Sequence, residues 1–228
     1  MKTQLLNCKS RIITIISKSI FLLLLMAIVV SQGCSKDEPV VATDLISQIN
    51  ALPVEALNAD ETNFLLLMRE EEKLAKDVYV TLYAKWNVNV FLNISPSEQD
   101  HTDAVLALIN KYSLVDPVAT NEVGVFTDDH LQELYDQLVT AGSTSVLDAY
   151  KVGATIEDLD IFDLKAAISK TDNQDLNLVW ENLSMGSRNH MRSFYGQIVG
   201  LGSTYTAQFI SQEELIAIIS TPRENNKP

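Results

Sequence analysis

The chain has 228 residues, of which 17 are Lys or Arg and 30 are Asp or Glu, so its formal net charge is −13. This acidic balance excludes a nucleic-acid partner, because phosphate binding needs clustered Lys and Arg, and the 2 Cys exclude a disulfide framework. A hydrophobic share of 46% excludes wholesale disorder, and the low count of 8 Gly and 6 Pro favours helices, so we expect an all-α fold.

The N-terminal residues 1–33 have the pattern of a secretory signal peptide. Basic residues come first, and the apolar run 20–30 is shorter than the about 20 residues of a membrane-spanning helix. The run ends in Ser31-Gln32-Gly33-Cys34, which resembles a bacterial lipobox, although Ser31 stands where Leu is usual. We therefore expect acylated Cys34 to anchor the protein to a lipid bilayer of the cell envelope, facing the periplasm or the cell surface. The alternative is plain secretion with Cys34 as a free thiol.

Residues 34–43 follow as a tether, residues 44–220 form the helical domain, and residues 221–228 form a flexible C-terminus. Apolar residues at helical spacing predict four long helices, over residues 60–86, 90–112, 145–169 and 175–201. Three shorter helices are expected over residues 44–57, 128–140 and 212–220. The link between the second and third long helices is long, whereas the other two links are short. This connectivity is typical of a ferritin-like four-helix bundle with one long crossover, which here carries a short helix.

Titratable residues interrupt the apolar rows of all four long helices. The inward-facing residues of this kind are Glu71, Glu98, His101, Glu157, Asp160 and His190. An isolated buried carboxylate costs several kcal/mol and would protonate instead, so four in one core need cations. Glu98 and His101 are three residues apart, which places both side chains on one helix face.

Two divalent metal ions would balance the four carboxylates, and two neutral imidazoles would complete the ligand set. Oxygen and imidazole ligands suit iron best, with manganese or zinc as alternatives. In this scheme Glu71 and Glu157 bridge the ions, Glu98 and His101 bind one ion, and His190 and Asp160 bind the other. Because bridged ions lie about 3.5–4 Å apart, the scheme requires His101 and His190 to lie within about 10 Å of each other.

Four motifs carry a resemblance to a known family. They are Met68-Arg-Glu-Glu-Glu-Lys-Leu-Ala75, Ser97-Glu-Gln-Asp-His101, Ile156-Glu-Asp-Leu-Asp-Ile161 and Gly186-Ser-Arg-Asn-His190. Together they resemble the bacterial ferritin-like family called domain of unknown function 2202, over roughly residues 60–200. The resemblance implies a ferritin-like bundle with a presumed metal site. The related rubrerythrin-type pattern has Glu-x-x-His on its fourth helix as well. Here Ser187 replaces that Glu, and we infer that Asp160 could supply the missing carboxylate.

Each candidate ligand also has a structural interpretation. Glu98 could belong to a capping box opened by Ser95, with Pro96 starting the helix late. Glu71 lies in a run of three Glu, which is usually solvated, and Asp160 lies in an acidic stretch. A core His is more often hydrogen-bonded than metal-bound.

The sequence also predicts positions for two basic residues near His190 and for the third His. Arg188 and Arg192 are expected to form an exposed basic face, the alternative being pairs with carboxylates behind the ligands. We expect His130 at the surface.

Three functions remain open from the sequence. The protein could be a di-metal carboxylate oxidoreductase that oxidises Fe(II) or reduces oxygen or peroxide, with that small oxidant or the metal ion as its ligand. It could instead bind metal without catalysis, an alternative favoured by the lack of a Cys-based electron donor. It could also be a metal-free helical adaptor. A homodimer is compatible with each of the three.

Overall fold

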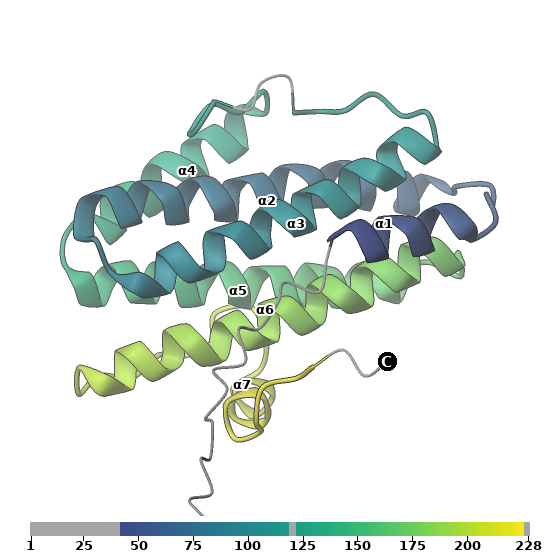
Figure 1. Cartoon of the computed structure of the whole chain (residues 1–228). Coiled ribbons are helices and arrows are strands. Elements are labelled where there is room, and N and C mark those ends of the chain that lie inside the picture. Colours follow the sequence, from purple (N-terminus) through teal and green to yellow (C-terminus); the bar gives the residue numbers. More distant parts are fainter. Residues whose placement is uncertain (1–41, 119–121, 226–228) are drawn as a thin grey trace, which may run out of the picture. The chain divides into compact units, whose positions relative to one another are not determined.

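The computed structural model describes residues 42–118 and 122–225, and every regular element within them is an α-helix. The helices are α1 (Ala42–Ala51), α2 (Ala59–Trp86), α3 (Asn89–Lys111), α4 (Asp129–Gly142), α5 (Val146–Ile168), α6 (Gln174–Gly200) and α7 (Gln212–Ile219) (Figure 1). The predicted all-α class is confirmed, and the four long helices begin and end within one residue of their predicted bounds. The predicted signal peptide, Cys34 and nearly all of the tether lie outside the described residues.

The four long helices α2, α3, α5 and α6 form the bundle. Two residues join α2 to α3 and five join α5 to α6, whereas the connection from α3 to α5 is long and contains α4. Helix α5 runs antiparallel to α2, because Tyr79 meets Glu157 while Glu61 meets Thr171 further along. Helix α6 runs antiparallel to α3, because Glu98 meets His190 while Tyr112 meets Asp175. The predicted connectivity of short, long and short links is confirmed.

Helix α3 passes through Pro96 without ending. It begins at Asn89, so Ser95 is an interior residue and does not cap a helix start. The late start considered for this helix is therefore wrong, and so is the capping-box interpretation of Glu98. Proline removes one backbone hydrogen bond from a helix interior. Packing of the apolar face, which includes the buried Phe91 and Ile94 before it, holds the helix together there.

The apolar core is divided into two clusters along the bundle. One cluster includes Tyr79, Phe91, Phe194 and Ile198, and the other includes Leu65, Leu108, Trp180 and Leu183. On α3 the first cluster extends to Ile94 and the second begins at Ala104, with Glu98 and His101 between them. On α6, His190 lies between Leu183 and Met191 in the same way. The titratable groups therefore occupy the middle of the bundle, with apolar packing on both sides.

A buried lysine attaches the crossover to the bundle. Lys73 on α2 is 1% exposed, and its Nζ lies 2.5 Å from Asp77 Oδ2. The same ammonium donates to the backbone carbonyls of Glu122 and Val125 at 3.0 and 3.1 Å and lies 4.2 Å from the ring centre of Phe126. One side chain thus satisfies two crossover carbonyls and a buried carboxylate, which fixes the crossover on α2.

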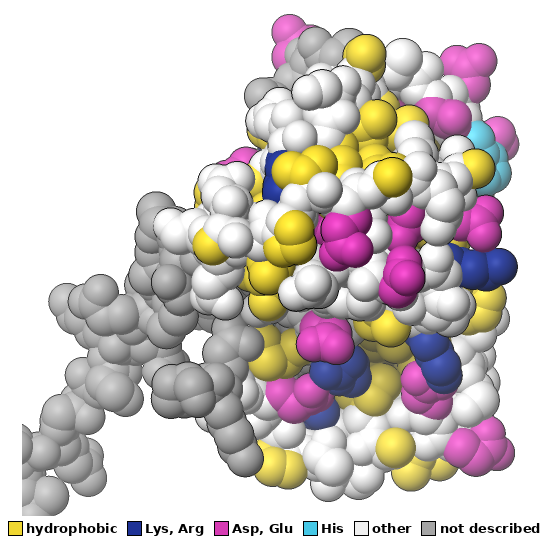
Figure 2. Space-filling view, turned by 90° about the vertical axis from the view of Figure 1, so that its right-hand side faces the viewer, with side chains coloured by type: hydrophobic (Ala, Val, Ile, Leu, Met, Phe, Trp, Pro, Cys, Tyr) yellow, Lys and Arg dark blue, Asp and Glu magenta, His cyan; other side chains and the backbone are white. Residues whose placement is uncertain are grey.

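On the face of the molecule seen in Figure 2, the acidic side chains do not form a single patch and are spread among apolar, basic and uncharged ones. His130 is exposed, as expected. Within the described residues, no helix is both long and apolar enough to cross a membrane.

Candidate metal centre

Five titratable side chains from all four bundle helices meet between the two apolar clusters. Their potential ligand atoms form two groups, and within each group these atoms lie within 4.8 Å of one another. The first group is Glu72, Glu98 and His101, and the second is Glu98, Glu157 and His190. All five residues are buried. Because Glu98 belongs to both groups, it is the candidate bridging ligand.

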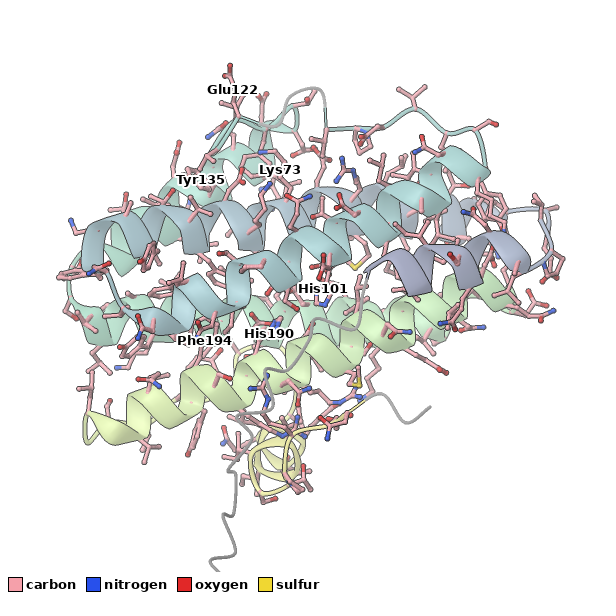
Figure 3. The ribbon with its side chains drawn as sticks, in the orientation of Figure 1. Lys73, His101, Glu122, Tyr135, His190 and Phe194 are labelled. Atoms are coloured by element: carbon pink, nitrogen blue, oxygen red, sulfur yellow. The ribbon has the colours of Figure 1, made fainter. Side chains whose placement is uncertain are left out.

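The two oxygens of Glu98 face different histidines. Oε2 lies 2.9 Å from His101 Nδ1, and Oε1 lies 2.8 Å from His190 Nδ1. Glu72 Oε2 lies 3.1 Å from His101 Nδ1, and Glu157 Oε2 lies 3.5 Å from His190 Nδ1. The centres of the two imidazole rings are 5.7 Å apart, and Figure 3 shows both rings in the middle of the bundle. The predicted separation of less than about 10 Å is therefore met.

The second group contains polar atoms that lie close together without aligned hydrogen bonds. Glu98 Oε1, Glu157 Oε2 and His190 Nδ1 are fully buried, and although both oxygens lie 2.8–3.5 Å from the nitrogen, none of the three atoms has the geometry of a hydrogen bond with any described residue. An unsatisfied buried polar group costs about 1–3 kcal/mol, and more when it is charged. Three such atoms that converge on one point are what a metal ion would satisfy by coordination, so the residues present fit a metal ion here.

The electrostatics also favour a cation. Burial opposes ionisation of Glu98, but His190 and His101 outweigh it and hold its pKa well below its ordinary value. Burial raises the pKa of Glu157 to about 7. Burial alone would lower the pKa of His190, but the carboxylates of Glu98 and Glu157 raise it to about 10. In the metal-free protein, protons held at the two groups balance the carboxylate charge, and metal ions can replace those protons.

The comparisons with known proteins agree with the motifs. The family model described as "Uncharacterized protein domain (DUF2202)" matches residues 61–222. The chain belongs to the DUF2202 family. It is similar to "Uncharacterized protein MJ0754" of Methanocaldococcus jannaschii, with 52% identity over 180 residues that cover 79% of this chain and 97% of the relative.

A solved structure is similar as well. The crystal structure of hypothetical protein MJ0754 from Methanococcus jannaschii matches with a TM-score of 0.75 and 53% sequence identity, covering 76% of this chain and 99% of that chain. The DUF2202 match begins at Glu61 and ends at Pro222, so it contains all five residues of the two groups.

Within the DUF2202 domain, four of the six predicted ligands are in the two groups. These are Glu98, His101, Glu157 and His190. Glu71 is outside both groups, and its neighbour Glu72 takes the place beside His101. Glu71 is nevertheless buried, its Oε2 has no partner among the described residues, and burial together with the charge of Asp163 raises its pKa well above the ordinary value.

Glu71 is predicted as a ligand from an apolar stripe that does not coincide with the buried face of α2. This stripe runs through Phe64 and Leu67, but both are only partly buried in the structure. The fully buried row follows spacings of three and four residues through Leu65, Met68, Glu72, Ala75 and Tyr79. Glu72 is therefore the residue of the three-Glu run that points at His101. The spacing from Met68 to Glu72 and on to Tyr79 could have revealed this.

Asp160 lies beside the two groups without joining them. It is 3% exposed, and burial together with the carboxylates of Glu72 and Glu157 raises its pKa well above the ordinary value. Ser187, at the position of the missing carboxylate, donates its hydroxyl to its own helix at Leu183 O, 3.0 Å away. Ser187 is therefore committed to the backbone, whereas Asp160 is a buried carboxylate that interacts electrostatically with acids of both groups.

Two residues that support the ligands were not among the predicted site residues. Tyr79 is fully buried and donates its hydroxyl to Glu157 Oε1, which orients that carboxylate. Gly186 on α6 lies against the far edge of the His101 ring, where an added Cβ would lie 2.5 Å from Nε2. Both contacts join helices that are far apart in sequence, so no local pattern signals them.

Proposed function

We propose that the protein binds two divalent transition-metal ions in the middle of its bundle, with iron as the preferred metal. The observation that carries the proposal is the convergence of Glu98 Oε1, Glu157 Oε2 and His190 Nδ1. These atoms are buried, both oxygens lie 2.8–3.5 Å from the nitrogen, and none of the three forms an aligned hydrogen bond among the described residues. The second support is the sharing of Glu98 between two three-ligand groups. Carboxylate oxygens and imidazole nitrogens suit iron and manganese, and also zinc.

Each ion has an assigned set of ligands in this proposal. Glu72 and His101 hold the first ion, Glu157 and His190 hold the second, and Glu98 bridges them. Three protein ligands per ion leave coordination positions open for a small molecule. The Asp160 carboxylate interacts electrostatically with acids of both groups. We propose that it supplies a further oxygen ligand when the second ion binds.

A bound iron pair would supply one-electron oxidation and reduction at the centre. The chain's own residues then have three tasks. Glu98 fixes the spacing of the two ligand sets, Tyr79 fixes the orientation of Glu157, and the apolar clusters on both sides limit the entry of water. This arrangement is suited to the oxidation of Fe(II) or the reduction of oxygen or peroxide.

Metal analysis and thermal unfolding test the binding step. The protein is expressed with iron and its metal content is measured, and then Fe(II) is added to metal-free protein under anaerobic conditions. Metal at 100 times its dissociation constant should stabilise the fold by about 2.7 kcal/mol, which raises the melting temperature by roughly 5–10 °C. The double variant His101→Ala/His190→Ala should lose this increase. The variant His130→Ala removes an exposed His and should retain it.

The outcomes separate the candidate functions. Folded protein that holds no iron, manganese or zinc would contradict the proposal. Bound metal with consumption of peroxide or oxygen supports an oxidoreductase. Bound metal without turnover supports metal storage or sensing instead.

We also propose that acylated Cys34 anchors this centre at the cell envelope. The support is the sequence Ser31-Gln32-Gly33-Cys34 after a short apolar run. Mass spectrometry of the mature N-terminal peptide should find Cys34 as the lipidated first residue, and Cys34→Ser should move the protein from the membrane fraction to the soluble one. A mature protein that retains residues before Cys34 would contradict the anchor.

A further inference from the structure

The residues next to His190 in the sequence bind the C-terminal segment. Arg188 Nη2 and Arg192 Nη2 lie 2.5 and 2.9 Å from the Glu224 carboxylate. Asn189 exchanges two hydrogen bonds with the Glu224 backbone, each of 2.9 Å. Residues 221–225, which were expected to form a flexible end, are thus held against α6 at the level of His190. The exposed basic face expected at Arg188 and Arg192 is therefore wrong, because both residues are only partly exposed and pair with Glu224 to anchor this segment.

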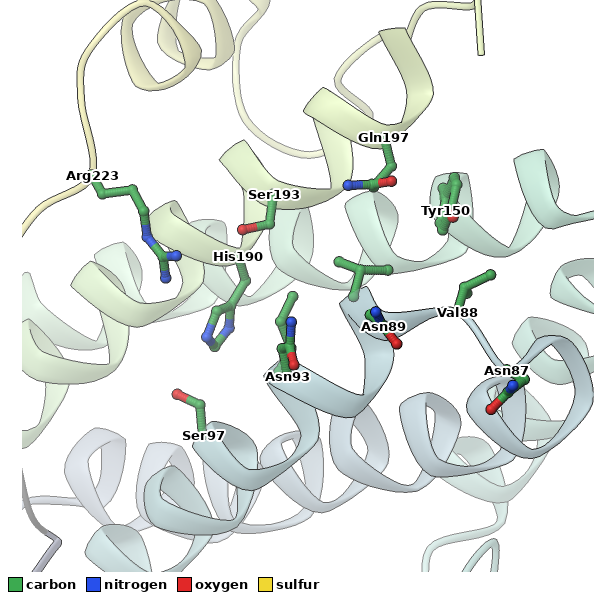
Figure 4. Close-up of a pocket in the computed structure, with 12 residues that line it drawn as sticks. Asn87, Val88, Asn89, Asn93, Ser97, Tyr150, His190, Ser193, Gln197 and Arg223 are labelled. Atoms are coloured by element: carbon green, nitrogen blue, oxygen red, sulfur yellow. The ribbon is translucent and has the colours of Figure 1, made fainter. Parts of the chain in front are cut away.

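This anchoring places Arg223 over an open cleft. The cleft has a volume of about 750 Å³ and lies between α3 and α6. Two rows of side chains face each other across it: Asn89, Asn93 and Ser97 on α3, and His190, Ser193 and Gln197 on α6. In Figure 4, Arg223 and His190 lie at one end of the cleft with Ser97, and Gln197 and Tyr150 lie towards the other end.

The lining has a definite chemistry. Amides and hydroxyls predominate, and Val88, Val90, Ile94 and Tyr150 add an apolar wall. No carboxylate lines the cleft among the described residues, although the chain as a whole has a net charge of −13. Arg223 is exposed, and none of the described carboxylates forms an ion pair with it. The cleft is therefore suited to an organic molecule with one negative charge, and its volume is in the range of small-molecule sites.

We propose that this cleft binds a small organic carboxylate, whose charged group pairs with Arg223 beside His190 and whose body lies along the amides towards Tyr150. Guanidinium and carboxylate groups match in a planar, two-bond geometry. His190 forms part of the inner wall and belongs to the second ligand group, so the bound carboxylate lies next to the second ion. This last step rests on the proposed function, whereas binding in the cleft does not. The substrate class of the centre would then be organic acids.

A pair of probe molecules with matched shape tests the charge requirement. Benzoate and its neutral analogue benzamide are titrated by calorimetry into the full-length, metal-loaded protein. Arg223→Gln should weaken benzoate binding by about tenfold to hundredfold and leave benzamide binding unchanged. Lys170→Gln makes the same charge change on an exposed residue in the link between α5 and α6, and it should alter the binding of neither probe. Asn93→Leu, which fills the cleft from α3, should weaken both probes.

The outcomes are distinct for the cleft and for the metal centre. Absent benzoate binding, or benzoate binding that is equally tight in Arg223→Gln and Asn93→Leu, would overturn the cleft proposal even if the protein holds two metal ions. Protein that takes up no metal but binds benzoate through Arg223 would support the cleft and contradict the proposed function. In Co(II)-loaded protein, benzoate should change the visible absorption of the metal. An unchanged spectrum at saturating benzoate would overturn the contact with the second ion.

Discussion

Gly186→Ala should uncouple metal binding from folding, because the added methyl group meets a ligand directly. A Cβ at this position would lie 2.5 Å from His101 Nε2 and 2.6 Å from Cε1. The ring must therefore move by about 0.9 Å to reach ordinary van der Waals contact, which is several times the about 0.2 Å tolerance of a metal–ligand distance. The neighbouring ring atom, Nδ1, already lies 2.9 Å from Glu98 and 3.1 Å from Glu72, so the movement disturbs the first ligand group.

The two effects of this substitution differ in size. Overpacking costs about 1–3 kcal/mol, and replacing Gly by Ala in a helix interior returns about 1 kcal/mol. The free energy of unfolding should therefore fall by no more than about 2 kcal/mol. Displacing a residue that orients a metal ligand typically weakens metal binding by about 10–100-fold. Metal affinity should thus change far more than stability does.

Gly196→Ala is the matched control on the same helix. An added Cβ there meets nothing within 4 Å, so only the helix-propensity gain of about 1 kcal/mol remains. Urea unfolding of both metal-free variants and calorimetric titration with Fe(II) or Mn(II) measure the two quantities. If Gly186→Ala binds metal as tightly as Gly196→Ala does, the first ligand group is not a metal site and the reasoning from His101 fails.

Three further predictions concern charge. Lys73→Met leaves the buried Asp77 carboxylate with only the ammonium of Lys76, 3.7 Å away, and should lower the free energy of unfolding in urea by about 3–5 kcal/mol; Lys73→Met/Asp77→Leu should restore only part of this, because it also lacks the donor to the Glu122 and Val125 carbonyls. Metal affinity measured against pH should rise up to about pH 10, where His190 loses its proton, and should change more steeply below about pH 7, where Glu157 also binds one. Asp160→Asn should stabilise the metal-free protein by about 0.5–2 kcal/mol at pH 7 in urea unfolding, because the raised pKa makes folding take up a proton, and this gain should shrink towards pH 4.

The bundle could be predicted from the sequence because its helices are long and periodic. Over more than twenty residues, the spacing of apolar side chains outweighs single contrary signals such as Pro96 in α3. Helix ends also carry local chemistry. Ser145 caps α5 by accepting from the Asp148 backbone, and Asn58 forms a capping box with Glu61 at the start of α2. Fold class and connectivity therefore follow from information within each segment.

The candidate site could be predicted only to the accuracy of a helix face. Adjacent residues on a helix differ by about 100° in direction, so an error of one residue in the stripe exchanges Glu71 for Glu72. Both are buried, and the strongest charge effect on each comes from another helix, from Asp163 of α5 on Glu71 and from His101 of α3 on Glu72. Only the position of His101, from α3, decides which of the two carboxylates faces the centre.

Contacts between distant segments were beyond sequence reasoning altogether. A lysine directly after three Glu predicts a solvated side chain, yet Lys73 is buried by the crossover that folds over it. Arg188 and Glu224 are separated by 36 residues, and nothing in either neighbourhood indicates the pair. The cleft depends on this pair, because the anchored segment carries Arg223 to its rim. Features of this kind arise from tertiary packing and need coordinates.

The position of the titratable groups itself argues for a function beyond stability. Each apolar cluster contains side chains from all four long helices, so the bundle is held together on both sides of its middle. If apolar residues replaced Glu72, Glu98 and Glu157, the two clusters would form one continuous core. Replacing buried ionic groups in this way is often neutral or stabilises the fold by about 1–4 kcal/mol. The chain instead keeps three acids and two imidazoles there, and several of their buried polar atoms lack an aligned hydrogen bond. Burying these acids and imidazoles is unfavourable by itself. They lie at a level of the bundle where side chains from all four helices converge, and a bound cation there would compensate for the cost.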